Sequence, residues 1–147
     1  MPSVFAYGTL RDPDVLKLVL GRAVDPTAIA PATAPGYRAV FFPRRTYPAL
    51  IRDSAATATG TLLTNLAPAD LALLDLFEGE EYARTSIEII VSGQNATADV
   101  YWPAQPISPD APAWHLADWT ARHKAAFLGV EADNLIELRR RLTDLPH

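Results

Sequence analysis

Apolar residues open the chain as a continuous run, VFAY at residues 4–7, which is typical of a buried β-strand. The run stops at Gly8 and Thr9 before apolar character returns at Leu10. Glycine adopts backbone angles that other residues avoid, and threonine hydrogen-bonds nearby amides, so a sharp turn is predicted here. We expect the turn to direct backbone N–H groups at an anion or a carbonyl oxygen.

Residues 12–21 carry the first helical pattern. Asp12 is an N-cap residue, Pro13 falls in the first turn, and Gly21 stands where the helix should end. The side chains predicted to be buried are Val15, Leu18 and Val19.

Residues 68–79 carry the second helical pattern, with Pro68 in its first turn and Gly79 at its end. Apolar side chains recur every three positions and predict a buried face. They are Leu71, Leu74 and Phe77.

Most of the chain between these helices and after them favours β-structure. Residues 24–35 are rich in Ala, Pro and Thr and show no periodicity, so a loop is predicted there. Polar and apolar residues alternate in the later segments, which indicates half-buried antiparallel strands. The predicted strands are residues 36–42, 47–53, 57–65, 84–92 and 96–102, with a turn at Gly93-Gln94-Asn95 joining the last two.

The last 35 residues change to a helical pattern. Residues 113–129 place aromatic side chains at helical spacing, and residues 131–142 continue as a helix with a polar face. His115 and His123 lie eight positions apart, which is not the spacing of a paired metal site, so both are expected to pack among the aromatic rings.

Together the elements predict an α+β fold, with a small mixed sheet curled toward a barrel and helices beside it. A chain of 147 residues with 49% apolar side chains has room for one core. We therefore expect one domain over residues 1–147, with a barrel core in 1–112 and a helical tail in 113–147 packed on it.

Charge and cysteine content narrow the function classes. The net charge of −4 disfavours nucleic acid and anionic membranes as partners and leaves small molecules as the expected ones. No cysteine is present, so disulfides and thiolate nucleophiles are excluded. The start of the chain lacks the features of a signal peptide, and no apolar run approaches the roughly 20 residues of a membrane span, so a cytoplasmic location is expected.

The acidic run LDLFEGEEY holds the most plausible catalytic group. Glu78 comes at the end of an apolar helix, where partial burial raises a carboxyl pKa toward values useful in proton transfer. Asp75 lies one turn earlier. The alternative interpretation is that these are ordinary solvated acids at a helix end. Neither a metal-ligand spacing nor a nucleotide-binding motif occurs, so no metal or cofactor is expected.

Short motifs along the chain resemble the γ-glutamylcyclotransferase-like superfamily. They are Tyr7-Gly8-Thr9-Leu10, Tyr47-Pro48-Ala49, and Leu74-Asp75-Leu76-Phe77-Glu78-Gly79 followed by Tyr82 and Arg84. The tail, from Trp114 to Phe127, is similar to that of the plant avirulence-induced-gene-like branch. Each motif is short, but their order and spacing together are specific.

The resemblance implies a small mixed β-barrel flanked by helices, with a pocket where the Tyr7–Leu10 turn and Glu78 meet. It implies an enzyme that releases 5-oxoproline from γ-glutamyl compounds by attack of the substrate's own α-amine on its γ-carbonyl. Glu78 would be the catalytic acid–base. The residues expected to bind substrate are Tyr7, Gly8, Thr9, Leu10, Tyr47, Tyr82 and Arg45, and those expected to support the helix end are Asp75 and Arg84.

Simpler interpretations stand beside several of these roles. Tyr7 and Tyr82 would be core residues, and Arg44 and Arg45 a solvated pair. A binding module that recognises a small acid or amine without turnover is the alternative to an enzyme. The sequence leaves open which amine departs and what the oligomeric state is.

Overall fold

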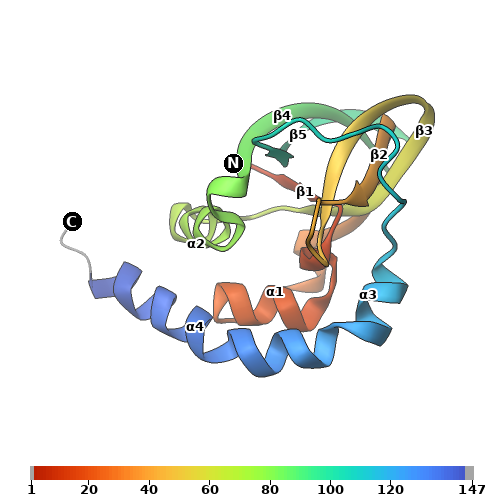
Figure 1. Cartoon of the computed structure of the whole chain (residues 1–147). Helices are drawn as coiled ribbons and strands as arrows, with labels where there is room; N and C mark the ends of the chain where they lie inside the picture. The colour runs from red at the N-terminus through yellow and green to blue at the C-terminus, as the bar shows by residue number, and fades with distance from the viewer. Residues whose placement is uncertain (1, 145–147) are drawn as a thin grey trace.

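The computed structural model describes residues 2–144, and the five strands in this range close into a barrel (Figure 1). Around the barrel the strands follow the order β1-β3-β2-β4-β5. A parallel pairing of Val4 with Asp99 closes it, and the other neighbours are antiparallel. The predicted α+β fold with a small mixed β-barrel is thus confirmed; Met1 and residues 145–147 of the predicted domain lie outside the described residues. The strands are β1 (Val4–Ala6), β2 (Ile29–Phe41), β3 (Pro48–Leu63), β4 (Tyr82–Val91) and β5 (Gln94–Pro103).

The loop predicted over residues 24–35 is wrong, because strand β2 begins at Ile29 after a single 3₁₀ turn, Pro26–Ala28. It pairs with β3 from end to end but with β4 only at Ala32 and Thr33. Most of one side of β2 is therefore a sheet edge, where proline's missing N–H costs no ladder hydrogen bond. The proline-rich composition therefore led to the prediction of a loop where a strand forms.

Strand β3 is one long strand where two were expected, at residues 47–53 and 57–65. Its pairing with β2 shifts in register between Pro35 and Tyr37. Gly36 lies at this shift with φ of 87°, a conformation that glycine adopts readily. The bend there lets one strand continue around a corner of the barrel.

Strands β4 and β5 form the predicted hairpin, but its turn lies earlier than expected. Val91 pairs with Gln94, so the loop consists of Ser92 and Gly93. Their φ values of 51° and 75° are those of the two-residue turns that match the twist of a hairpin. Gln94 and Asn95 therefore belong to β5.

Helix α1 (Pro13–Leu20) has the predicted ends. The side chain of Asp12 accepts hydrogen bonds from the amides of Asp14, at 2.9 Å, and Val15, at 3.2 Å. Gly21 ends the helix with φ of 74°. The buried face differs from the predicted stripe: Leu18 is only partly buried, and the buried residues are Val15, Leu16, Val19 and Leu20.

Helix α2 (Pro68–Glu78) begins and ends as predicted. The carboxylate of Asp70 accepts a hydrogen bond from the amide of Ala67 at 2.9 Å and pairs with Arg22 at 2.8 Å, which ties α2 to the end of α1. Leu71 and Leu74 are buried. Gly79 follows the helix with φ of 68°.

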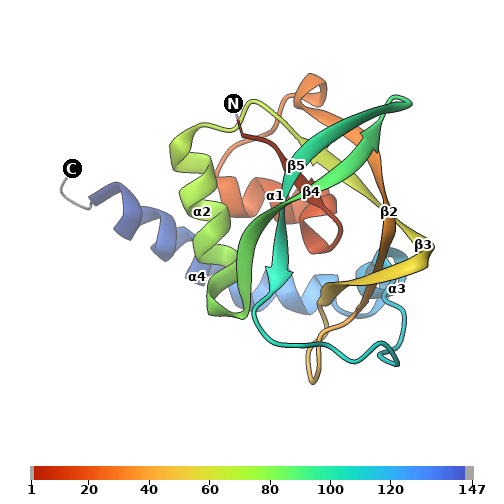
Figure 2. The ribbon, with the colours of Figure 1, turned by 90° about the horizontal axis from the view of Figure 1, so that it is seen from above.

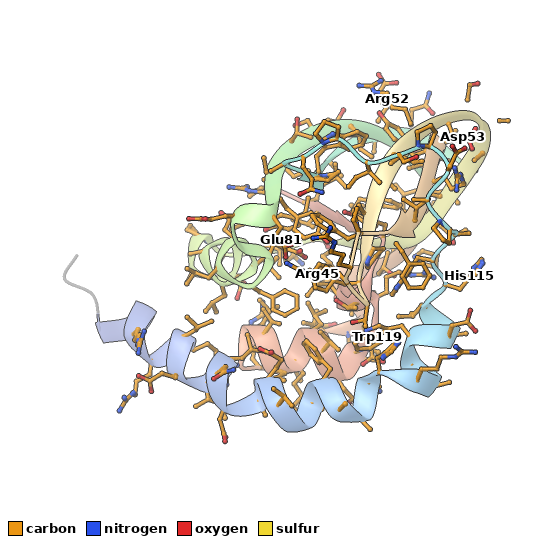
Figure 3. All side chains as sticks on the ribbon, in the orientation of Figure 1. Arg45, Arg52, Asp53, Glu81, His115 and Trp119 are labelled. Carbon is orange, nitrogen blue, oxygen red and sulfur yellow. The ribbon has the colours of Figure 1, made fainter. Side chains whose placement is uncertain are left out.

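The tail forms two helices, α3 (Leu116–Arg122) and α4 (Lys124–Asp144), that meet at His123. The single helix expected over residues 113–129 is thus wrong in its start and its continuity. His115 precedes α3 and is exposed (Figure 3), contrary to the packing role expected for it, whereas His123 is half-buried. Helix α4 runs past α1 on the same side of the barrel (Figure 2) and is held there by Lys124, which pairs with Asp12 at 3.0 Å and Asp14 at 2.7 Å.

Buried apolar side chains form two clusters. One lies inside the barrel and is drawn from the strands and Tyr7. The other joins β1, α1 and α2 to the tail, including Trp114, Trp119 and Leu135. The tail packs on the rest of the chain through this second cluster, and the site described below lies along it. Among residues 2–144, no helix is both long and apolar enough to cross a membrane.

Candidate functional site

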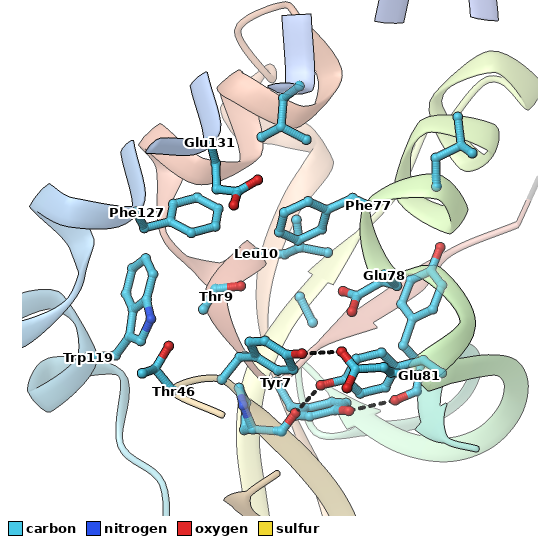
Figure 4. Close-up of a pocket in the computed structure, with 18 of the residues that line it drawn as sticks. Tyr7, Thr9, Leu10, Thr46, Phe77, Glu78, Glu81, Trp119, Phe127 and Glu131 are labelled. Carbon is cyan, nitrogen blue, oxygen red and sulfur yellow. Dashed lines mark hydrogen bonds between the residues drawn. The ribbon is translucent and has the colours of Figure 1, made fainter. Parts of the chain in front are cut away.

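A cavity of about 240 Å³ lies where β1, α2 and the tail meet (Figure 4). One wall is the end of β1 and the turn after it, from Phe5 to Leu10. A second is the end of α2 and the turn that follows, and a third comes from α3 and α4. The segment Thr46-Tyr47-Pro48 and Tyr101 complete the lining. The predicted turn and the predicted helix end are thus brought together.

Glu78 is the last residue of α2, and its side chain points into the cavity (Figure 4). Burial raises the pKa of its carboxyl to about 8, and the negative charge of Glu81 adds to the rise in pKa. Within the described residues, no hydrogen bond or ion pair is made by the Glu78 side chain. An unpaired carboxyl with such a pKa exchanges protons near neutral pH.

Tyrosine rings surround Glu78, and their hydroxyl protons point elsewhere. The Tyr7 hydroxyl donates to the carbonyl of Tyr101 at 2.5 Å, and the Tyr82 hydroxyl donates to the carbonyl of Pro48 at 2.5 Å. Burial, and then the charge of Glu78, raises the pKa of Tyr7 well above its usual value. These phenols stay neutral and shape the wall, so Tyr7 and Tyr82 both line the cavity and pack in the core.

The turn after β1, Gly8 to Leu10, lines the cavity. The amides of Arg11 and Asp12 donate to the carbonyls of Gly8 and Thr9, at 3.1 and 3.0 Å. Among the turn and cap hydrogen bonds of residues 2–144, none is donated by the amide of Gly8, Thr9 or Leu10. Because buried amides normally have partners, these three are suited to a bound carboxylate or oxyanion.

Gly8 is required for a different reason from the one expected. Its φ of −122° is not in the left-handed region that favours glycine. A Cβ at this position would instead lie 2.8 Å from Cγ of Pro48, which is closer than such atoms approach. Close packing against Pro48, rather than an unusual turn, explains the glycine.

The rim of the cavity is fixed by three polar side chains. The Tyr47 hydroxyl donates a hydrogen bond to Glu81, and Arg45 pairs with Glu81 at 3.2 Å and donates to the Tyr47 oxygen at 2.9 Å. Tyr47 lines the cavity as predicted. Arg45 does not line the cavity. It lies beside Glu81 (Figure 3), whose carboxylate compensates its charge.

Asp75 and Arg84, the two residues expected to support the helix end, form an ion pair with Oδ1 and Nε 3.2 Å apart. The pair is on the surface, since 45% of the Asp75 side chain is exposed. Asp75 also accepts a hydrogen bond from the Tyr101 hydroxyl at 2.8 Å. Asp75 does not line the cavity, whereas its hydrogen-bond partner Tyr101 does.

Several lining residues had no site role in the sequence prediction, among them Glu81, Trp119, Phe127 and Glu131. The rings of Trp119 and Phe127 are 5.6 Å apart, and Phe127 meets Phe77 edge-on at 6.1 Å. The spacing of residues 127, 131 and 135 by four places them on one helical face, a signal present in the sequence. No group of three or more metal-ligating side chains is found within residues 2–144.

Comparisons with known proteins agree on a family. A family described as "Gamma-glutamyl cyclotransferase, AIG2-like" matches residues 4–121. AIG2-like protein D of Arabidopsis thaliana is 30% identical over 142 residues, which are 94% of this chain and 91% of that protein. AIG2-like protein A of the same plant is 29% identical over 86% of this chain and 76% of its own length.

Solved structures agree on the fold. A solution structure of an Arabidopsis thaliana protein is 26% identical, with a TM-score of 0.66 over 99% of this chain and 95% of that one. A structure titled "Gamma-glutamyl cyclotransferase" is 16% identical, with a TM-score of 0.58 over 98% of this chain and 87% of that one, and shows the same fold. By its family match and its similarity to the AIG2-like proteins, the chain belongs to the AIG2-like gamma-glutamyl cyclotransferase family.

Proposed function

We propose that the cavity is the active site of a γ-glutamylcyclotransferase, which releases 5-oxoproline and a free amine from a γ-glutamyl amine or peptide. The observation that carries the proposal is the unpaired carboxyl of Glu78, with its raised pKa, in a cavity also lined by Gly8 and Thr9. The family supports this chemistry.

In the proposed reaction the nucleophile belongs to the substrate. The α-amino nitrogen attacks the γ-carbonyl carbon, a five-membered ring closes, and the bond to the departing nitrogen breaks. Glu78 takes a proton from the attacking nitrogen and returns one to the departing nitrogen, so its carboxylate is restored. An internal nucleophile held in place has a large effective concentration, which explains how the reaction proceeds without a catalytic Ser or Cys.

The remaining lining residues hold the γ-glutamyl group in this scheme. The free amides of Gly8, Thr9 and Leu10 bind its α-carboxylate or the oxyanion that develops at the carbonyl. The rings of Tyr7, Tyr47 and Tyr82 enclose its methylene chain and exclude water.

Gly8→Ala tests the turn. The added methyl group would push on Pro48, whose carbonyl holds Tyr82, so the cavity wall must shift. We expect a stability loss of about 1 to 3 kcal/mol from overpacking, together with a loss of affinity for a γ-glutamyl ligand measured by titration calorimetry. Gly129→Ala is the control, since nothing lies within 4 Å of a Cβ there. Normal affinity in Gly8→Ala would remove the turn from the site.

The pH dependence of kcat/KM tests the acid–base role. Because the base form of Glu78 starts the reaction and its pKa is about 8, kcat/KM should rise with pH toward that value. Removing the charge of Glu81 lowers the pKa of Glu78, so Glu81→Gln should move the rise to lower pH. Glu80→Gln is the control, because Glu80 is exposed and does not contribute to the raised pKa of Glu78. An unshifted profile in Glu81→Gln would contradict the assignment.

An assay of 5-oxoproline release over a panel of γ-glutamyl amines and peptides tests the function itself. We expect turnover of at least one compound. If none turns over while one still raises the melting temperature, the protein is a binding module and the proposal is wrong.

A further inference from the structure

Helix α4 forms one wall of the cavity but packs loosely on the rest of the chain. Within residues 124–141, whose burial the structure describes, Leu135 is the one buried residue. Two hollows lie beside the helix. The first is the cavity, which Phe127 and Glu131 line (Figure 4), and the second is a groove of about 420 Å³ between Leu18 of α1 and Ala132 of α4. Because protein interiors are close-packed, a helix beside two hollows has little contact to hold it in place.

The other walls of the cavity are held more firmly. Strand β1 pairs with β3 from Val4 to Ala6, and α2 buries Leu71 and Leu74. Helix α3 is anchored by Trp119, which is 2% exposed. If one wall moves while the fold persists, that wall is therefore α4.

The helical path of the tail is interrupted between α3 and α4. His123, where the two helices meet, has φ of −127° and ψ of −21°, which are not α-helical values. Trp119 fixes α3 on one side of this residue. A rotation at His123 would therefore move α4 while α3 stays in place, as in hinges where a few residues at the end of an element take up the change in backbone angles.

Two basic side chains hold α4 against opposite ends of α1. Lys124, at the start of α4, pairs with Asp12 at the start of α1, 3.0 Å away. Arg139, near the other end of α4, donates a hydrogen bond to the carbonyl of Leu18. Its side chain lies over Gly21, where a Cβ would be 2.7 Å from the Arg139 Nε, so glycine at this position makes room for it. We call Lys124 and Arg139 the latch residues.

The contact of Lys124 also reaches the turn after β1. Asp12 is buried, with 6% of its side chain exposed, and its amide donates a hydrogen bond to the carbonyl of Thr9 at 3.0 Å. Thr9 in turn lines the cavity. Asp12 therefore links the position of α4 to that of the turn.

We propose that α4 is a lid, which pivots at His123 to let a ligand from solvent reach Glu78 and is held closed on α1 by the latch residues. The lid requires that the cavity takes up a ligand but no particular reaction. Its test therefore stands apart from that of the proposed function.

Thiol labelling measures the opening directly, because the natural chain has no cysteine. Ala6→Cys places a thiol in the cavity wall, and Ala98→Cys places one inside the barrel, at residues that are 4% and 2% exposed. The probe is dithiodipyridine, a small uncharged reagent that must enter the cavity as a ligand does. Ala98→Cys should react only through global unfolding, whereas Ala6→Cys should react at least about 10-fold faster through the open lid. Equal rates would show that α4 opens only when the whole chain unfolds, and would overturn the proposal.

The latch residues are tested in the Ala6→Cys protein. Lys124→Met and Arg139→Met keep much of the side-chain length but remove the charge, so each should speed labelling by roughly 3- to 30-fold, the range of hydrogen bonds and ion pairs of charged groups. Arg140→Met is the matched control, because Arg140 is the next residue but pairs with Glu137 within α4. It should leave the rate unchanged. If neither latch variant labels faster than this control, the cavity is reached by another route and the proposal is wrong.

Discussion

Replacing Glu78 with glutamine is expected to lower turnover by roughly 10² to 10⁴, the loss typical of a positioned acid–base group. Glutamine keeps the size and polarity of the side chain but does not exchange protons. Binding of substrate should be largely retained, so the effect should fall on kcat. The measurement is 5-oxoproline release at saturating substrate.

Asp75→Asn is the matched control, since it removes a carboxylate one turn earlier on the same helix. The surface pair of Asp75 with Arg84 contributes about 0 to 1 kcal/mol, so this variant should keep most of its activity and stability. Full activity in Glu78→Gln, or loss of turnover in Asp75→Asn with an unchanged melt, would show that the proton shuttle is misassigned.

Glu78→Gln should also change stability with pH. The folded pKa of Glu78, about 8, lies above its ordinary value of 4.5. Between these values the folded state holds a proton that the unfolded chain releases, so the wild type loses stability as pH rises. The glutamine side chain does not titrate, so the variant does not lose this stability and should melt at a higher temperature than the wild type at alkaline pH. Melting curves at several pH values measure the difference.

Trp119→Ala should be the most destabilising of the substitutions considered. The indole is 2% exposed, packs on Phe127 and belongs to the core cluster that joins the tail to the barrel. Truncating such a group costs about 3 to 5 kcal/mol, so for 3 kcal/mol the melting temperature should fall by about 6 to 12 °C. Thermal melting measures it.

Trp102→Ala removes the same side chain at a half-buried position, against Tyr37, and serves as the control. It should cost less. A smaller loss in Trp119→Ala than in this control would mean that the tail does not stabilise the fold.

The local elements were predictable where short-range chemistry determines them. Asp12 and Gly21 define the ends of α1 through capping, and Gly79 ends α2 with a positive φ. Strand β2 was missed because its prolines lie along a sheet edge, which depends on neighbours distant in the sequence. The continuity of β3 through its bend likewise depends on pairing with β2.

The site was likewise predictable where it depends on short sequence motifs, and not where it depends on contacts between residues distant in the sequence. Glu78 and the Tyr7–Leu10 turn were identified from motifs, and the cavity brings them together. The pairing of Arg45 with Glu81 was not predicted, because it joins residues 36 positions apart. Glu131 was missed because α4 reaches the cavity only through the packing of the tail on α1 and α2.

In the proposed reaction, Glu78 and the cavity convert γ-glutamyl compounds by internal cyclisation. The most direct test is to incubate the wild type and Glu78→Gln with γ-glutamyl amines and quantify 5-oxoproline, free amine and glutamate. We expect equal amounts of 5-oxoproline and amine from the wild type, no glutamate, and far less product from the variant. Release of glutamate with the amine would indicate hydrolysis by water and would contradict the proposed reaction, as would equal product formation by the two proteins.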